Sequence, residues 1–88
     1  MISKATADFW RLYLDLPPDI QEAARQAHRK FLENPTQPGL HLERLRYDPR
    51  TWSVCVTLNY LAVAYRQNDS WLWFWIGSHR DFDRQFPR

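Results

Sequence analysis

Residues 52–76, WSVCVTLNYLAVAYRQNDSWLWFWI, contain three apolar runs joined by short polar segments. Apolar and polar residues alternate over Trp52–Leu58, which is the pattern of a β-strand with one buried face. Tyr60–Arg66 predicts the next strand, and the polar segment Gln67–Ser70 predicts a hairpin turn after it. Trp71–Ile76 is apolar at every position, as is typical of a central strand buried on both faces. An antiparallel meander is therefore expected here.

One more strand is predicted just before this meander, over Leu40–Tyr47. Because side chains alternate between the faces of a strand, Arg44 and Arg46 should point to one side, together with Leu40 and Leu42. Asp48 and Pro49 mark the turn into the meander.

Two helices are predicted closer to the N-terminus. Apolar residues recur with helical spacing from Thr6, a suitable N-cap, until Pro17 and Pro18 end the segment. A second helix begins near Pro18 and ends near Asn34, because Pro35 disfavours helical backbone before it. The buried stripes are Phe9, Leu12, Tyr13 and Leu16 in the first helix and Ile20, Ala23, Ala24, Ala27 and Phe31 in the second. Alanine-rich stripes allow close approach, so an antiparallel helical hairpin on a sheet is expected.

The segment after Gly77 completes the predicted fold. Ser78 can cap a short helix or turn that extends to Arg84. The fold class is therefore α+β, with two N-terminal helices packed on an antiparallel sheet of about four strands and a short C-terminal helix or turn. A chain of 88 residues has enough apolar surface for one core, so residues 1–88 are expected to form a single domain.

Composition narrows the classes of protein. Hydrophobic residues make up 44% of the chain and aromatic residues 16%, which excludes a disordered chain. The formal charge is +2, and all basic residues except Lys4 and Lys30 are arginines, whose planar head groups suit phosphate and carboxylate partners. This composition slightly favours a nucleic-acid ligand or an acidic partner.

Other classes of site are not expected. The single cysteine, Cys55, rules out a disulfide within the chain, and no Cys/His spacing resembles a zinc site, so we expect no metal and no cofactor. The longest apolar run, Trp71–Ile76, is far shorter than the roughly 20 residues of a membrane span. With no signal-peptide pattern at the N-terminus, a cytoplasmic location without membrane contact is expected.

Two groups of residues are candidates for chemistry. Arg44 and Arg46, with Arg50 and Arg80, can form a phosphate-binding face, or they are ordinary solvated charges. His79 can exchange a proton near neutral pH beside Arg80 and Asp81, or it can be a capping or packing residue.

A row of tryptophans follows the same strand, at Trp71, Trp73 and Trp75. Such a row can stack bases, but in a small domain it more often supplies the core or a partner contact.

Several short motifs occur in a characteristic order along the chain. They are Asn34-Pro35, Pro38-Gly39-Leu40, Trp52-Ser53-Val54 followed by Val56, Asn59-Tyr60 followed by Ala62, and Trp73 to His79. From about Thr6 to Arg84 the chain resembles toxins of the RelE/ParE superfamily, which belong to bacterial type II toxin–antitoxin systems. The most specific part is Phe74–Asp83. The resemblance implies a compact toxin neutralised by a cognate antitoxin, with many members cleaving mRNA on the ribosome and others poisoning DNA gyrase.

The resemblance also implies site residues. Arg44 and Arg46 match a basic pair on a strand, and His79, Asp81 and Phe82 match the terminal segment. With Arg80, these residues give a catalytic set of His79, Arg44, Arg46, Arg80 and Asp81 for an mRNA interferase, an endoribonuclease.

Three positions depart from the family pattern. Cys55 and Leu61 stand where the family usually has arginine, and Phe82 stands where tyrosine is common. The substitutions favour an attenuated toxin; the alternative is a non-catalytic binding protein or a gyrase-poisoning toxin.

Overall fold

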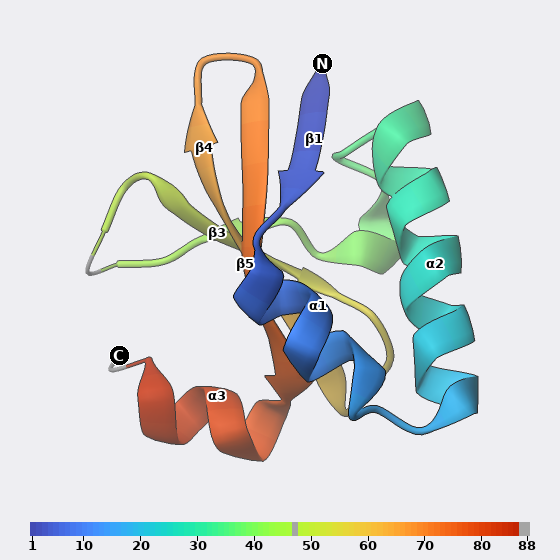
Figure 1. The fold of residues 1–88 in the computed structure, drawn as a ribbon. Helices are drawn as coiled ribbons and strands as arrows, with labels where there is room; N and C mark the ends of the chain where they lie inside the picture. The colour runs from blue at the N-terminus through green and yellow to red at the C-terminus, as the bar shows by residue number, and fades with distance from the viewer. Residues whose placement is uncertain (47, 87–88) are drawn as a thin grey trace.

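A five-stranded sheet in the order β1–β5–β4–β3–β2 runs through the computed structural model, which describes residues 1–46 and 48–86 (Figure 1). The strands are β1 (Ile2–Ala5), β2 (Glu43–Arg44), β3 (Thr51–Cys55), β4 (Tyr60–Gln67) and β5 (Ser70–Ser78). The helices are α1 (Ala7–Leu14), α2 (Pro18–Glu33) and α3 (His79–Gln85), with a short 3-10 helix η1 (Pro38–Leu40). The predicted α+β class is confirmed.

The meander forms, but its first strand is shorter than predicted: β3 ends at Cys55, and Leu58, the predicted end, is exposed in the bend before β4. Strands β3, β4 and β5 pair antiparallel, with Ala62 opposite both Val54 and Ile76. Strand β5 lies between β1 and β4, so the prediction that the Trp71–Ile76 run is an interior strand is confirmed.

Strand β1 was not predicted, and it makes the sheet mixed. It pairs parallel to β5, with Ile2 opposite Ser70 and Ala5 opposite Trp73. The backbone N–H of Thr6 continues the pairing by donating to the Trp73 carbonyl at 2.9 Å. Four residues carry too little alternation to predict a strand, and β1 is stabilised by a partner far along the chain.

The strand predicted over Leu40–Tyr47 is much shorter than expected. Leu40 belongs to η1, and His41 adopts the left-handed conformation at φ 47°, which turns the chain before a strand can begin. Only Glu43–Arg44 pairs with β3, while Tyr47 lies outside the described residues.

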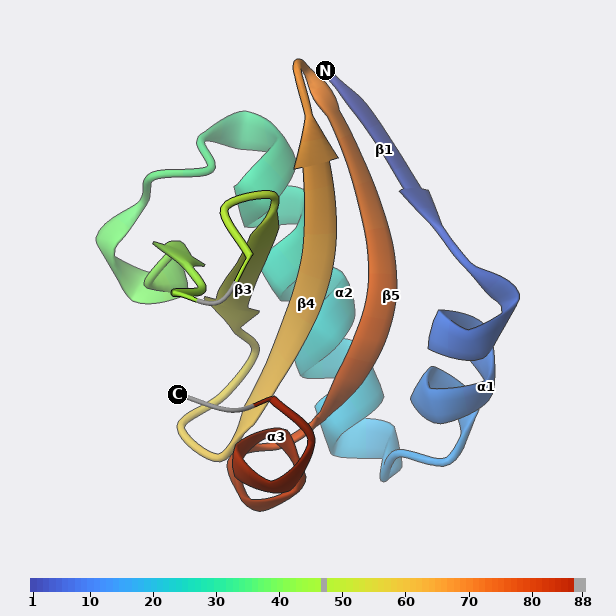
Figure 2. The same cartoon turned by 90° about the vertical axis from the view of Figure 1, so that its left-hand side faces the viewer.

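The helix boundaries follow the predicted signals. The Thr6 side-chain hydroxyl accepts a hydrogen bond from the Phe9 N–H at 3.1 Å and caps α1. Helix α2 begins at Pro18 and is capped at its end by Asn34. The two helices run in roughly opposite directions; α2 crosses one face of the sheet, and α1 lies beside β5 below β1 (Figures 1 and 2).

The sheet separates two apolar cores. On the α2 face, the Phe31 ring meets Trp71 and Trp73 edge to face, at centroid distances of 5.0 and 5.1 Å. On the α3 face, the buried residues are Leu61, Val63, Trp75, Phe82 and Phe86.

A β-bulge decides which core each tryptophan joins. The register of β4 and β5 shifts between Val63 and Ala64, which places Trp75 on the face opposite to Trp71 and Trp73. All three indoles are buried, at 4–7% exposed, so they pack the two cores and do not form an exposed stacking platform.

Candidate functional site

A groove of about 380 Å³ opens on the α3 face of the sheet. Helix α3 lies over only one end of this face, and none of the described helices lies over the neighbouring part of β4 (Figure 2). The groove is lined by His41, Glu43, Arg44, Leu45, Arg46, Ser53, Cys55, Leu61, His79, Phe82 and Phe86. Residues from four regions of the chain therefore meet at one place.

Arg44 and Arg46 line the groove at the edge of the sheet, and both are exposed. Arg44 lies opposite Trp52 in the β2–β3 pair, and Trp52 packs against the core on the α2 face. Because β2 ends at Arg44, Arg46 does not continue the strand, and the predicted alternation of the two arginines along one strand is wrong. Directly opposed residues share a face, so the Arg44 side chain leaves β2 on the side of Trp52, and Arg44 borders the groove at the edge of the sheet.

His79 lies at the first turn of α3 and is partly exposed. Its backbone N–H donates to the Asn59 carbonyl at 2.8 Å, and the adjacent Ser78 hydroxyl accepts from the Asp81 N–H at 3.1 Å. These two contacts fix the point at which the chain turns from β5 into α3, and so they position the imidazole beside the groove.

Arg80 and Asp81 are not among the residues that line the groove. Arg80 is exposed, and the Asp81 carboxylate bonds to Arg84, whose guanidinium lowers the pKa of Asp81. Arg50 also lies apart, with its Nε 3.4 Å from an Asp48 carboxylate oxygen. Of the five predicted catalytic residues, the structure brings together His79, Arg44 and Arg46.

Glu43 is a groove residue that the sequence did not single out. It lies opposite Ser53 in the β2–β3 pair, and both residues line the groove. Partial burial, and then the Glu43 carboxylate, raise the pKa of the Cys55 thiol, so this thiol stays protonated at neutral pH. The alternation predicted for Leu40–Tyr47 placed Glu43 on the side opposite to the arginines, so it was not grouped with them.

The floor of the groove is apolar at the positions where the resemblance implies arginines. Leu61 is 3% exposed and packs in the core of the α3 face, while Cys55 is partly buried. Phe82 stacks on Phe86 at a centroid distance of 4.9 Å, so the ring at this position belongs to the same core. Among the described lining residues, the arginines are therefore only Arg44 and Arg46, which come from the segment at the edge of the sheet.

This arrangement brings three kinds of chemistry together. His41, His79 and Glu43 carry side chains that can exchange protons, Arg44 and Arg46 carry guanidinium groups that can bind phosphate, and all five residues line one groove. Within residues 1–46 and 48–86, no group of three or more His, Cys, Asp or Glu side chains is arranged to hold a metal ion. None of the helices in the same ranges has the length and apolar character needed to cross a membrane.

The fold resembles solved toxin structures. A chain of the RelB–RelE antitoxin–toxin complex from Methanococcus jannaschii superposes with a TM-score of 0.76 at 11% identity, covering 94% of this chain and 98% of that one. The YoeB/ParE toxin from Agrobacterium tumefaciens gives a TM-score of 0.70 at 18% identity, with coverages of 90% and 99%. YafQ from E. coli gives 0.67 at 10% identity, with coverages of 91% and 94%.

The sequence comparisons add no relative to these structures. No protein-family model matches the chain, and no curated protein matches it. The structural likeness extends over at least 90% of the chain in all three superpositions, and from it we conclude that the chain adopts the RelE-type toxin fold.

Proposed function

We propose that this chain is the toxin of a type II toxin–antitoxin pair and that its groove binds RNA. The observation that carries the proposal is the convergence of His79, Arg44 and Arg46 on one groove of a chain with the fold of the RelE, YoeB and YafQ structures. The M. jannaschii structure is an antitoxin–toxin complex, which supports a protein antitoxin as the partner of this chain.

The residues of the groove suit cleavage of mRNA on the ribosome by transfer of a phosphoryl group within the RNA. Arg44 and Arg46 bind the phosphates that flank the scissile bond. Glu43, the one carboxylate among the described lining residues, takes the proton of the ribose 2′-hydroxyl as that oxygen attacks phosphorus. His79 in its protonated form gives a proton to the departing 5′-oxygen. The products are a 2′,3′-cyclic phosphate and a 5′-hydroxyl.

The apolar floor predicts slow cleavage. A phosphate bound at the floor of the groove would contact Leu61 and Cys55, which provide no positive charge to stabilise the transition state. Removal of one preorganised donor of this kind costs about 2.7–4 kcal/mol in other enzymes, or roughly 10²–10³ in rate. We therefore place this chain among attenuated toxins.

The same floor favours a second candidate function. A groove with an apolar floor and a basic rim can bind a partner surface without cleaving anything, as a gyrase poison or a catalytically silent toxin would. The two candidates differ in what stops first in a growing cell: loss of protein synthesis supports the interferase, and DNA damage supports the gyrase poison.

Three single variants test the proposal on translating ribosomes. His79→Ala should lower the rate of mRNA cleavage by about 10²-fold or more with little change in binding. Arg44→Ala should weaken binding and reduce its dependence on salt by about one unit of slope. Arg80→Ala is the matched control, because Arg80 is an exposed cation next to His79 that does not line the groove. Cleavage that is unchanged in both groove variants would reject the assignment.

The antitoxin is tested separately, by co-expression with the product of the neighbouring reading frame. Acidic contacts to the arginines and apolar anchors are expected to hold the pair together. Failure to co-purify at both low and high salt would count against the toxin assignment.

A further inference from the structure

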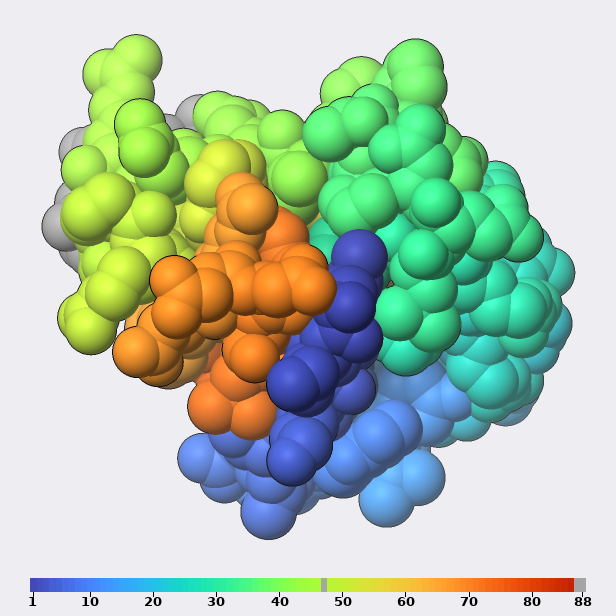
Figure 3. Space-filling model, turned by 90° about the horizontal axis from the view of Figure 1, so that it is seen from above, coloured from blue at the N-terminus to red at the C-terminus, as the bar shows by residue number. Residues whose placement is uncertain are grey.

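A second cavity, of about 320 Å³, lies on the α2 face between the two N-terminal helices and the sheet. Seen from above, the blue strand β1 lies between the orange β4–β5 hairpin and the green end of α2 (Figure 3). The walls are mainly apolar and include Phe9, Ala24, Ala27, Val54, Ala62 and Ile76. Among the described residues that line it, none is an aspartate or a glutamate. This cavity is separated from the groove by the sheet.

Small side chains leave this space open. Ala24 and Ala27 come from α2 and Ala62 from β4, and all three reach the cavity with a single methyl group. The volume is at the lower end of the roughly 300–1,000 Å³ of small-molecule sites, whose walls are likewise apolar with a few polar groups.

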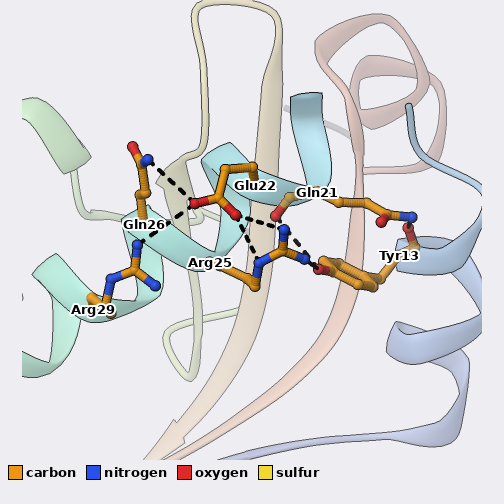
Figure 4. Close-up of polar contacts among 6 residues, drawn as sticks. All are labelled: Tyr13, Gln21, Glu22, Arg25, Gln26 and Arg29. Carbon is orange, nitrogen blue, oxygen red and sulfur yellow. Dashed lines mark hydrogen bonds and ion pairs between the residues drawn. The ribbon is translucent and has the colours of Figure 1, made fainter. Parts of the chain in front are cut away.

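A polar network holds the two helices at the rim of the cavity (Figure 4). Arg25 donates hydrogen bonds from Nη1 to the Tyr13 hydroxyl and from both Nε and Nη2 to one Glu22 carboxylate oxygen, at 2.9 and 2.6 Å, and so forms an ion pair with Glu22. The Gln21 amide donates to the Tyr13 carbonyl at 3.1 Å. The Arg25 guanidinium carries five N–H donors, so these contacts leave some of them for another acceptor.

A second polar group at the cavity centres on His28. The Trp73 Nε1–H donates to the Ser3 hydroxyl at 2.9 Å, and this hydroxyl is 2.9 Å from His28 Nε2. Desolvation lowers the pKa of His28, so the ring is neutral at pH 7. The hydrogen bond to Ser3 uses Nε2, and no hydrogen bond to Nδ1 is formed by the described residues, so Nδ1 can contact a ligand.

We propose that this cavity binds a small amphipathic carboxylate, with the apolar body against the alanines and the head group at Arg25 and His28. The volume limits the ligand to a short aliphatic or single-ring acid. The described lining holds no acidic residue and two cations, Lys4 and Arg25; since Glu22 pairs with Arg25 outside the lining, Lys4 adds the charge that favours an anion over a neutral molecule. This site is independent of the RNA groove and of the toxin assignment.

Octanoate is the probe, and octanol of the same chain length is its uncharged counterpart. Titration into the intact chain at neutral pH, followed by amide chemical shifts and tryptophan fluorescence, should show saturable binding of octanoate with shifts at Ala27 and His28. Octanoate should bind about tenfold more tightly than octanol. Absence of saturation at millimolar octanoate would overturn the proposal and leave the cavity as a socket for a partner's side chain. Equal binding of the two probes would overturn the preference for an anion.

Matched variants locate the site. Ala24→Leu fills the cavity and should weaken octanoate binding by about tenfold or more, whereas Ala23→Leu, on the same helix but outside the lining, should leave it unchanged. Arg25→Gln keeps the cavity open and should remove the difference between octanoate and octanol, and it serves as the test if Ala24→Leu does not fold. Octanoate binding that is unchanged in both Ala24→Leu and Arg25→Gln would show that the site lies elsewhere.

Discussion

The two faces of the sheet differ in the length of the helix that covers them and in the size of their cores. The α2 face carries a 16-residue helix and the larger core, in which Phe31 meets two tryptophans. The α3 face carries a seven-residue helix over one end and a core of five buried residues. Three charged residues and two histidines line the groove on that face. An incomplete layer of helices therefore leaves room for a polar groove beside a small core.

The comparison also explains why substitutions in the groove are constrained. Leu61 and Phe82 both line the groove and belong to the core of the α3 face. A polar residue at either position would gain contact with a ligand but would lose buried apolar surface. On the α2 face, the core and the cavity share residues in the same way, but the polar groups stand only at the rim.

The largest expected effect is on stability, and it differs between the two cores. Phe31→Ala should lower the free energy of unfolding by about 3–5 kcal/mol, because the ring is 1% exposed and contacts two indoles. Phe82→Ala should cost less, since this ring borders the groove, where water can enter the space that it leaves. Urea denaturation of both variants measures the difference. An equal loss would mean that the α3 face is as tightly packed as the α2 face.

Local signals in the sequence accounted for most of the fold. The N-caps Thr6 and Ser78 and the prolines predicted where each helix begins and where α2 ends, although α1 ends at Leu14, before Pro17. Alternation with polar turns predicted β3, β4 and β5, although β3 ends at Cys55 and not at Leu58. Strand β1 and the bulge in the β4–β5 pair were missed, because both depend on pairing with a distant strand or on register. Such information is absent from any local window.

The site was only partly predictable for a related reason. His79 could be placed because Gly77 and Ser78 mark the end of β5. Arg80 and Asp81 were grouped with it as sequence neighbours, but adjacent residues of a helix point in different directions. Glu43 was missed because its place in the groove depends on its register opposite Ser53.

The next largest expected effect is the loss of stability caused by Gly77→Ala, at the junction of the groove and the core of the α3 face. A Cβ atom at this position would lie 2.7 Å from Cη2 and 2.8 Å from Cζ2 of the Trp75 indole. The indole packs edge to face on Phe86 at a centroid distance of 5.3 Å and cannot move freely, so Gly77→Ala should cost about 1–3 kcal/mol.

Gly39→Ala is the control for this substitution. A Cβ atom at Gly39 meets nothing within 4 Å, so the stability should be unchanged or slightly higher. The thermal midpoint of both variants reports the result, and an unaffected Gly77→Ala would show that Trp75 can shift without loss.

A smaller effect, on RNA binding, is expected when a positive charge is introduced at the floor of the groove. Under the proposed function, Cys55→Arg should strengthen RNA binding severalfold and increase the salt dependence by about one unit of slope, because it adds one phosphate contact. The single variant is preferable to Leu61→Arg, which would replace a leucine that is 3% exposed. If Leu61→Arg is tolerated together with Cys55→Arg, growth inhibition should rise more than additively, since both would act on one phosphate.

Leu58→Arg is the matched control for Cys55→Arg. It adds the same charge on the same chain segment, at a side chain that is 92% exposed and does not line the groove. Growth inhibition and RNA binding should respond to Cys55→Arg only. An equal gain from both variants would assign the effect to net charge.

The smallest effect belongs to the α2 face and concerns the pH dependence of stability. Desolvation lowers the pKa of His28 below 6.5 in the folded chain, so the unfolded chain binds a proton first as the pH falls. The contribution of the neutral ring to stability is therefore fully present above about pH 7 and decreases as the pH falls through 6.5 towards the folded pKa. His28→Gln should remove this part of the pH dependence, so that wild type and variant converge between about pH 7.5 and 5.5 in urea denaturation. Parallel stability profiles over this range would show that the ring is as well solvated in the folded chain as in the unfolded one.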